Sequence, residues 1–227
     1  DDMETLEKNF RAIEKRLRDA SAKWGGVEIL AVTKTLDPEI INPVYDLGVR
    51  MVGENRVQEL LEKRDRLHPG LEVHMIGRLQ TNKVRQALPA VSMIQSLDRI
   101  ELLNEIDRRA AALEIRMPVL LQVNIAKEPQ KAGVFEEDLE AFVREAASRP
   151  GVRVEGLMAV MPLVENPEEV RPLFRGMRAW FDRLREADIP GANMRVLSMG
   201  MSDDCLVAAE EGATMVRLGR ALFGERN

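Results

Sequence analysis

The stretch ILAVTK, residues Ile29–Lys34, sets the pattern that decides the fold. Four apolar residues and a threonine are typical of a strand that is buried on both faces, as in a parallel sheet. The strand then ends on Lys34, although lysine is among the residues least often buried unless it is paired. Either this side chain simply leaves the strand end for solvent, or its amine serves a site located there.

Seven further short apolar runs follow, separated by stretches with helical periodicity. We expect strands at Glu28–Lys34, Arg50–Asn55, Glu72–Gly77, Val91–Asp98, Pro118–Asn124, Arg153–Met161, Arg195–Met201 and Thr214–Arg220. The intervening helices include Arg56–Leu67, Ile100–Leu113, Glu168–Ala187 and a short Asp203–Glu211. Strict alternation implies a parallel sheet with right-handed crossovers, and eight units are typical of a closed (β/α)8 TIM barrel. An open doubly wound sheet is the competing architecture, but no GxGxxG motif follows the first strand.

The amino-terminal segment lies outside this alternation. Apolar residues recur at three- and four-residue steps from Asp2 to Trp24, and Gly25-Gly26 ends the pattern. We expect an additional amphipathic helix that covers one end of the barrel. Neither a long linker nor a shift in composition divides the chain, so residues 1–227 are expected to form a single domain.

The composition excludes several classes of function. The chain has 227 residues, 45% of them hydrophobic, and a net charge of −5, whereas nucleic-acid binding needs a basic face. The single cysteine, Cys205, excludes an internal disulfide, and with two histidines it provides too few ligands for a structural zinc site. No apolar run is long enough to span a membrane, and no signal peptide is visible. We therefore expect a cytoplasmic protein without metal, nucleic-acid or membrane partners.

The ends of the last two strands are expected to form a phosphate site. Barrels frequently bind phosphate between the loops after strands seven and eight, at the amino terminus of a short helix. Ser202 follows strand seven, and Gly219 and Arg220 follow strand eight. Ser202 is also the expected N-cap of the helix after strand seven, which is compatible with phosphate binding. The adjacent Asp203 and Asp204 would repel a phosphate if they faced it, so we expect them to point away.

Three other polar residues lie in or directly after expected strands. Arg217 lies inside strand eight, where a guanidinium must point into the barrel mouth or have a buried partner. Asn55 ends strand two and either caps the following helix or reaches a ligand. His74, alone in an apolar strand, is expected to be a hydrogen-bonded core histidine.

Eight segments of the chain together resemble the pyridoxal-phosphate homeostasis proteins of the YggS type. In order, they are AVTK, GENRVQE, HMIGRLQTNK, SLDR, LLQVN, EGLMAVMP, LSMGMSDD and VRLGRALFGER. They extend from about Ile29 to Arg226, nearly the whole expected barrel, and their combination is far more specific than a single glycine motif. The resemblance implies the barrel of the alanine racemase N-terminal domain, without that enzyme's second domain.

The resemblance implies that pyridoxal 5′-phosphate is bound covalently. Lys34 would form the internal aldimine, a Schiff base, with this cofactor. Arg217 would face the pyridine nitrogen, and Asn55 would lie near the ring.

The resemblance likewise implies how the phosphate is held. Ser202 and the backbone N–H groups of Gly219 and Arg220 would bind it, while Ser198 and Met199 would shape the surrounding loop. Other members often carry serine or threonine where Arg220 stands. That difference leaves a backbone contact intact but forfeits a hydroxyl contact.

Three functions are compatible with such a site. The favoured one is a monomeric protein that holds pyridoxal phosphate for vitamin B6 homeostasis, delivers it to apoenzymes and has no catalytic residues. The second is a weak amino-acid racemase, and the third a barrel that binds another phosphorylated ligand without a covalent bond to Lys34. A cationic Arg217 opposite the pyridine nitrogen makes the ring a poorer electron sink. Racemisation also needs acid/base groups on both faces of the substrate carbon, and the only tyrosine, Tyr45, falls in the helix after strand one.

Overall fold

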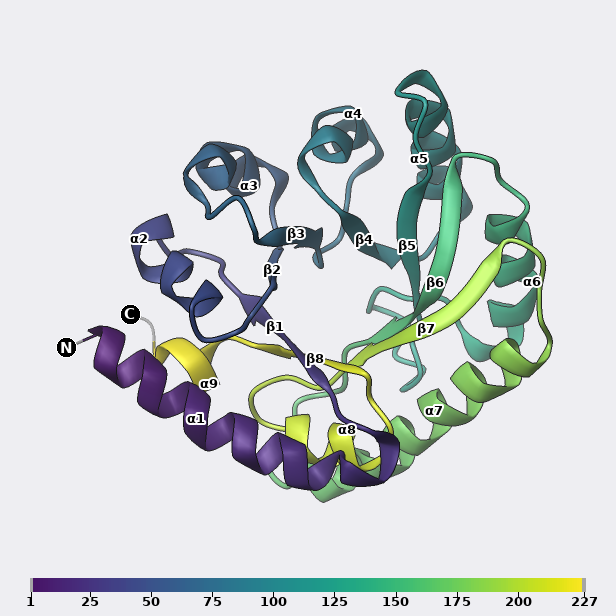
Figure 1. Cartoon of the computed structure of the whole chain (residues 1–227). Coiled ribbons are helices and arrows are strands. Elements are labelled where there is room, and N and C mark those ends of the chain that lie inside the picture. The colour runs from purple at the N-terminus through teal and green to yellow at the C-terminus, as the bar shows by residue number, and fades with distance from the viewer. Residues whose placement is uncertain (1, 226–227) are drawn as a thin grey trace.

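Eight parallel strands close into a barrel in the computed structural model, which describes residues 2–225 (Figure 1). They are β1 (Glu28–Val32), β2 (Met51–Glu54), β3 (Glu72–Met75), β4 (Met93–Leu97), β5 (Met117–Gln122), β6 (Val152–Ala159), β7 (Ala192–Met199) and β8 (Met215–Leu218). Neighbours in sequence are neighbours in the barrel, and β1 closes it against β8, with Leu30 opposite Arg217. The expected (β/α)8 barrel is confirmed, and every strand overlaps its expected range. Arg226, at the end of the last resembling segment, lies outside the described residues.

The helices between the strands differ widely in length. The long ones are α5 (Ile100–Ala112), α6 (Glu136–Ala147) and α7 (Arg171–Glu186). The short ones are α2 (Pro38–Ile41), α3 (Val57–Lys63), α4 (Val84–Ala87), α8 (Cys205–Glu210) and α9 (Arg220–Phe223). Single 3-10 turns flank them, namely η1 (Ala22–Trp24), η2 (Asn42–Tyr45), η3 (Arg64–Arg66), η4 (Thr81–Lys83), η5 (Leu88–Ala90) and η6 (Pro167–Val170). Within residues 2–225, no helix combines the length and the apolar character that a membrane span requires.

Apolar side chains fill two separate layers. The layer inside the barrel consists of Leu30, Val32, Met51, Met93, Leu120, Met158, Val196 and Met215. Neighbouring residues on the same strands, such as Ala31 and Val52, point outward and pack with the helices in a second, larger layer. Because both faces of the strands are buried, their sequences read as continuous apolar runs instead of alternating patterns.

The first helix, α1 (Asp2–Ala20), packs on the outside of the barrel. Its buried residues Leu6, Phe10 and Leu17 belong to the outer layer, and it lies along α8 and α9 (Figure 1). Asn9 Nδ2 in α1 donates a 2.9 Å hydrogen bond to the carbonyl of Leu222 in α9. The expected amphipathic helix is confirmed. Its place differs from the expectation, because it covers the barrel wall behind two short helices and not a barrel end.

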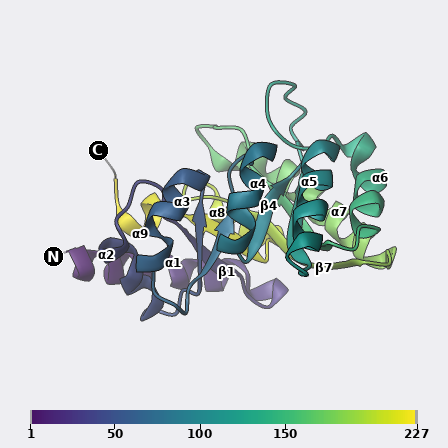
Figure 2. The same cartoon turned by 90° about the horizontal axis from the view of Figure 1, so that it is seen from above.

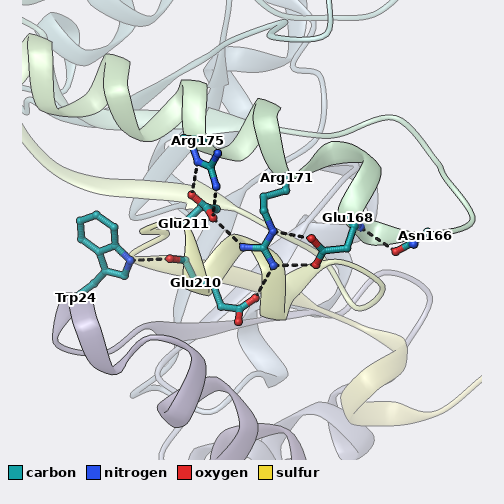
Figure 3. Close-up of polar contacts among 7 residues, drawn as sticks. All are labelled: Trp24, Asn166, Glu168, Arg171, Arg175, Glu210 and Glu211. Atoms are coloured by element: carbon teal, nitrogen blue, oxygen red, sulfur yellow. Dashed lines mark hydrogen bonds and ion pairs between the residues drawn. The ribbon is translucent and has the colours of Figure 1, made fainter.

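An ion network fastens the start of α7 to the end of α8 (Figure 3). Arg171 binds the carboxylates of Glu168, Glu210 and Glu211 at 2.7–2.8 Å. Other contacts extend the network to the remaining residues drawn, Trp24, Asn166 and Arg175. The network therefore anchors the segment that leads from β6 into α7.

The loops that follow β5 and β6 project from one end of the barrel (Figure 2). All strands are parallel, so this is the end at which their carboxyl termini meet. Barrel enzymes and binding proteins carry their sites on this face.

Candidate functional site

A cavity of about 340 Å³ opens at the carboxyl ends of β1, β6, β7 and β8. Five residues expected at a cofactor site lie on its wall: Lys34, Ser202, Arg217, Gly219 and Arg220. The loop after β6 supplies much of the remaining wall, through Met161, Pro162, Leu163 and Val164. Small-molecule pockets usually combine such an apolar lining with a few polar groups, so the cavity suits one small ligand.

Lys34 lies two residues after the end of β1, in a tight turn. The turn spans Thr33–Leu36, where the N–H of Leu36 donates to the carbonyl of Thr33 at 3.1 Å. Its third residue, Thr35, has a φ of 66°, as a type II turn requires, although β-branched residues rarely adopt it. The chain passes from buried Thr33 to exposed Lys34 at the cavity wall. The lysine thus leaves the strand end and at the same time borders a cavity.

Arg217 is 2% exposed in β8, yet it also contributes to the cavity wall. Its Nη1 donates to Ser198 Oγ at 2.7 Å, and its Nη2 donates to the carbonyl of Ala159 at 2.9 Å. Both expectations for this residue are met, since it reaches the barrel mouth and has buried partners. Burial lowers the pKa of Arg217 to about 10, with a smaller opposing effect from the Asp204 carboxylate.

A chain of hydrogen bonds continues from Arg217 through the inside of the barrel. Ser198 Oγ donates to Gln95 Oε1 at 2.7 Å, and Gln95 Nε2 is 2.9 Å from His74 Nδ1. An amide nitrogen can only donate, so Nδ1 accepts. Burial lowers the pKa of His74 to about 4, which keeps the ring neutral. His74 is the hydrogen-bonded core histidine expected from the sequence. The sequence did not indicate the role of Gln95, which is an amide within an otherwise apolar strand.

The Ser202 side chain bonds to the start of α9 and not to α8. Its Oγ accepts a 3.0 Å hydrogen bond from the N–H of Ala221. The N-cap position of α8 belongs to Asp204, so the expectation that Ser202 caps the helix after β7 is wrong. The loop forms its own turn, in which Met201 N–H donates to Asp204 Oδ1 at 2.7 Å and Asp204 N–H to the Met201 carbonyl at 3.1 Å. Ser202 therefore faces the β8–α9 connection.

The two acidic residues beside Ser202 both contribute to the cavity wall. Asp203 is exposed, and its carboxylate pairs with the guanidinium of Arg220. Asp204 is half-buried, and its pKa is raised chiefly by burial. We expected both side chains to point away from a phosphate. Both border the cavity, where the Asp203 carboxylate is paired with Arg220 and burial raises the pKa of Asp204.

Three expected residues do not border the cavity: Asn55, Ser198 and Met199. Ser198 lies behind the cavity wall, where it orients Arg217. Met199 is fully buried in the outer layer. Asn55 follows β2, and its backbone packs closely on Gly77. A Cβ at position 77 would lie only 2.4 Å from the Asn55 carbonyl oxygen. Asn55 is not the cap of α3 either, since Arg56 holds that position without a side-chain hydrogen bond.

The residues around Ser202 fit a phosphate group. The first N–H groups of a helix lack intrahelical acceptors, and those at the start of α9 lie beside the Ser202 hydroxyl. Lys34 and Arg217 add positive charge to the same wall, where the Arg220 guanidinium is paired with Asp203. Within residues 2–225, no three metal-ligating side chains cluster together. The site therefore suits a small anionic ligand that also reacts or pairs with an amine.

Comparison with known proteins gives a consistent result. Residues 2–227 match the family described as "Alanine racemase, N-terminal domain". A pyridoxal phosphate homeostasis protein of Aquifex aeolicus is 44% identical over 225 residues, which cover 98% of this chain and 97% of that protein. The structure of PipY from Synechococcus elongatus PCC7942, with PLP bound, has a TM-score of 0.84 and 33% identity, covering 96% of this chain and 100% of PipY. Alanine racemase of Clostridium difficile 630 shares the fold, with a TM-score of 0.77 and 15% identity, covering 96% of this chain and 57% of the racemase.

Proposed function

Since the chain belongs to the pyridoxal phosphate homeostasis protein family, we propose that it binds pyridoxal 5′-phosphate and serves vitamin B6 homeostasis. One observation carries the proposal: Lys34, Ser202, Arg217, Gly219 and Arg220 come from three separate strand ends and line one cavity. An aldehyde-bearing phosphate ester with a pyridine ring calls for this combination of an amine, an anion site and a polar partner for the ring.

Each group of the ligand has a counterpart among these residues. The Ser202 hydroxyl and the N–H groups of Gly219 and Arg220 would hold the phosphate, as helix starts do in other proteins. Arg217 would pair with the ring nitrogen. Ser198 supports this role indirectly, because its hydroxyl accepts from Nη1 of Arg217 and so fixes the guanidinium.

Lys34 is the residue that would hold the cofactor covalently. When bound, pyridoxal phosphate supplies an aldehyde that condenses reversibly with a primary amine. Lys34 lies on the wall of an open cavity and is itself exposed, which favours entry and release of a ligand. Reversible holding and delivery to apoenzymes, by a monomeric protein, follow from the same proposal.

Two observations support holding the cofactor over catalytic turnover. Arg217 stays charged at neutral pH, because its pKa of about 10 is well above 7, and a cation at the ring nitrogen disfavours protonation there. Tyr45, the only tyrosine, stacks on His68 with ring centroids 3.8 Å apart and does not border the cavity. The cavity wall carries the carboxylates of Asp203, Asp204 and Glu225, and a racemase would have to use one of them as its second acid.

The proposal is tested by borohydride reduction in the presence of pyridoxal phosphate, followed by intact-protein mass and peptide mapping. We expect a single adduct on Lys34 in the wild type and none in Lys34→Ala. Lys8→Ala is the matched control, because Lys8 is an exposed lysine on α1 and its loss should leave the adduct unchanged. An adduct scattered over surface lysines, or an unmodified Lys34, would refute covalent binding at this site.

A second measurement separates holding from catalysis. Racemisation of L-alanine by the loaded wild type is compared with that of Lys34→Ala, and transfer of the bound cofactor to a pyridoxal-phosphate-dependent apoenzyme is followed by recovery of the latter's activity. We expect transfer without racemisation above the Lys34→Ala background. Racemisation that depends on Lys34 would favour the weak racemase instead.

A further inference from the structure

A cluster of buried charges lies directly behind the turn that carries Lys34. Lys63, the last residue of α3, is 3% exposed, and Glu54, the last residue of β2, is fully buried. Glu59, one helical turn before Lys63, completes the cluster. Lysine and glutamate are rarely buried, so the burial of Lys63 and Glu54 needs a physical explanation.

The ammonium of Lys63 contacts four oxygen atoms. Two belong to carboxylates, Glu54 Oε2 at 2.9 Å and Glu59 Oε2 at 2.7 Å. The other two are backbone carbonyls, Thr33 O at 2.7 Å and Leu36 O at 3.0 Å. These carbonyls belong to the first and last residues of the turn that holds Lys34, so a single side chain fixes both ends of that turn.

The carboxylates hold the turn at two further points. The hydroxyl of Thr33 donates to Glu54 Oε2, and the N–H of Thr35 donates to Glu59 Oε2 at 2.5 Å. Thr35 is the residue with a positive φ, a conformation that costs a β-branched residue energy unless its surroundings hold it. All three members of the cluster thus contact the residues on either side of Lys34.

The cluster is a costly way to stabilise a fold. Glu54 Oε1 is buried without a hydrogen-bond partner, and burial is the largest effect on the pKa of Glu54, which is raised. Replacing a buried ion cluster by apolar residues of similar volume is often neutral or stabilising. A requirement for a fixed backbone geometry next to Lys34 explains why charges occupy these positions.

We propose that Lys63, together with Glu54 and Glu59, is a positioning residue that fixes the Lys34 amine for its bond to the cofactor aldehyde. This inference rests on the proposed function. It concerns the covalent step and not the phosphate site, since the Lys63 ammonium bonds to Thr33, Leu36, Glu54 and Glu59, whereas Ser202 bonds to Ala221.

The test compares two ligands that differ at one group. Pyridoxal 5′-phosphate carries the aldehyde, whereas pyridoxine 5′-phosphate has an alcohol in its place and cannot bond to Lys34. In Lys63→Met, the rate of adduct formation on Lys34 should fall by roughly tenfold to a hundredfold, because small displacements of a reacting group have effects of this size. The dissociation constant of pyridoxine 5′-phosphate should stay within about twofold of the wild type, and Lys63→Arg should recover part of the rate.

Two further variants keep the test valid if Lys63→Met folds poorly. Lys63→Met with Glu54→Gln removes the buried ammonium and the buried carboxylate together, and Glu59→Ala removes the acceptor of the Thr35 N–H from a partly exposed position. Both should slow adduct formation without weakening pyridoxine 5′-phosphate binding. Lys8→Met is the control on an exposed lysine.

A ligand-free measurement separates this inference from the proposed function. Hydrogen exchange at the Thr35 amide should accelerate in Lys63→Met and in Glu59→Ala. If the wild type forms no adduct on Lys34, the proposed function fails, while the exchange data still report on the turn. If the wild type forms the adduct and the variants form it at the same rate, or lose both ligands equally, the positioning role is overturned.

Discussion

Replacing Arg217 by methionine should stabilise the ligand-free protein or leave its stability unchanged. Methionine keeps an unbranched apolar side chain of similar length in β8 but removes the guanidinium. Arg217 is 2% exposed, and its two hydrogen-bond acceptors, Ser198 Oγ and the Ala159 carbonyl, are both neutral. The variant therefore removes a buried charge that lacks a carboxylate directly bonded to it.

The size of the effect follows from the pKa. The pKa of Arg217 falls to about 10 from an ordinary value near 12.5, which at about 1.4 kcal/mol per pKa unit corresponds to roughly 3 kcal/mol against burying the charge. At pH 7 the guanidinium is charged in both the folded and the unfolded state, so this whole penalty opposes folding. In the variant, Ser198 keeps its bond to Gln95, while the Ala159 carbonyl loses a donor at a cost of about 1–3 kcal/mol. The expected net change is a gain of about 0–2 kcal/mol.

Urea unfolding at pH 7 measures this change, with and without pyridoxal phosphate. The midpoint of the ligand-free variant should equal or exceed that of the wild type, and pyridoxal phosphate should raise it less than it raises the wild-type midpoint. Arg220→Met is the control, because Arg220 is exposed on the same cavity wall and its ion pair with Asp203 is worth at most about 1 kcal/mol. A loss of more than about 2 kcal/mol in ligand-free Arg217→Met would show that the guanidinium stabilises the barrel and would refute the reasoning.

Three other changes have defined outcomes. Burial lowers the pKa of His74 from 6.5 to about 4. The neutral ring therefore contributes fully to stability above pH 6.5, and this contribution is lost as the pH falls towards 4. His74→Gln should flatten the pH profile of the urea midpoint over this range. Gly156→Ala should lower the free energy of unfolding by at least about 3 kcal/mol in the same assay. The reason is that φ of Gly156 is 152° and the new Cβ would lie 1.8 Å from the Val196 carbonyl oxygen. A change below about 1 kcal/mol would contradict this prediction. Arg171→Gln should lower the thermal midpoint in low salt and have a smaller effect in high salt, since it removes three ion pairs that salt screens, and an equal effect in both would argue against an electrostatic cause.

The barrel could be predicted from the sequence because its strands are buried on both faces. Runs such as ILAVTK show no alternation, and the strict succession of eight strands and helices leaves few topologies. The place of α1 could not be predicted in the same way. An amphipathic stripe through Leu6, Phe10 and Leu17 states that one face is buried, but it does not identify what covers that face.

The candidate site was predictable to the extent that barrel topology brings strand ends together. Lys34, Arg217 and Ser202 are far apart in the sequence, and the rule that parallel strands end on one face places them on one cavity wall. Local rules failed at Ser202. A serine directly before a short helix is a typical N-cap, but α8 begins three residues later, and the Ser202 hydroxyl accepts from the N–H of Ala221 in α9. Lys63 had only a misleading signal. Its spacing of four residues from Glu59 is typical of a surface ion pair on a helix, and nothing local indicates a bond to the Thr33 carbonyl thirty positions away.

The two buried charge groups flank β1 and differ in kind. On one side of β1, Arg217 of β8 lies opposite Leu30 of β1. On the other side, Gly53 of β2 lies opposite Val32 of β1, and β2 ends at the next residue, Glu54. Arg217 has neutral partners, so its removal relieves a penalty, whereas removal of Lys63 leaves Glu54 and Glu59 without their cation and should destabilise the ligand-free protein by about 3 kcal/mol or more. Opposite stability changes, combined with slower adduct formation in Lys63→Met and weaker cofactor binding in Arg217→Met, would show that both charge groups are retained for the cofactor site. Equal losses of stability would instead assign both groups to the fold.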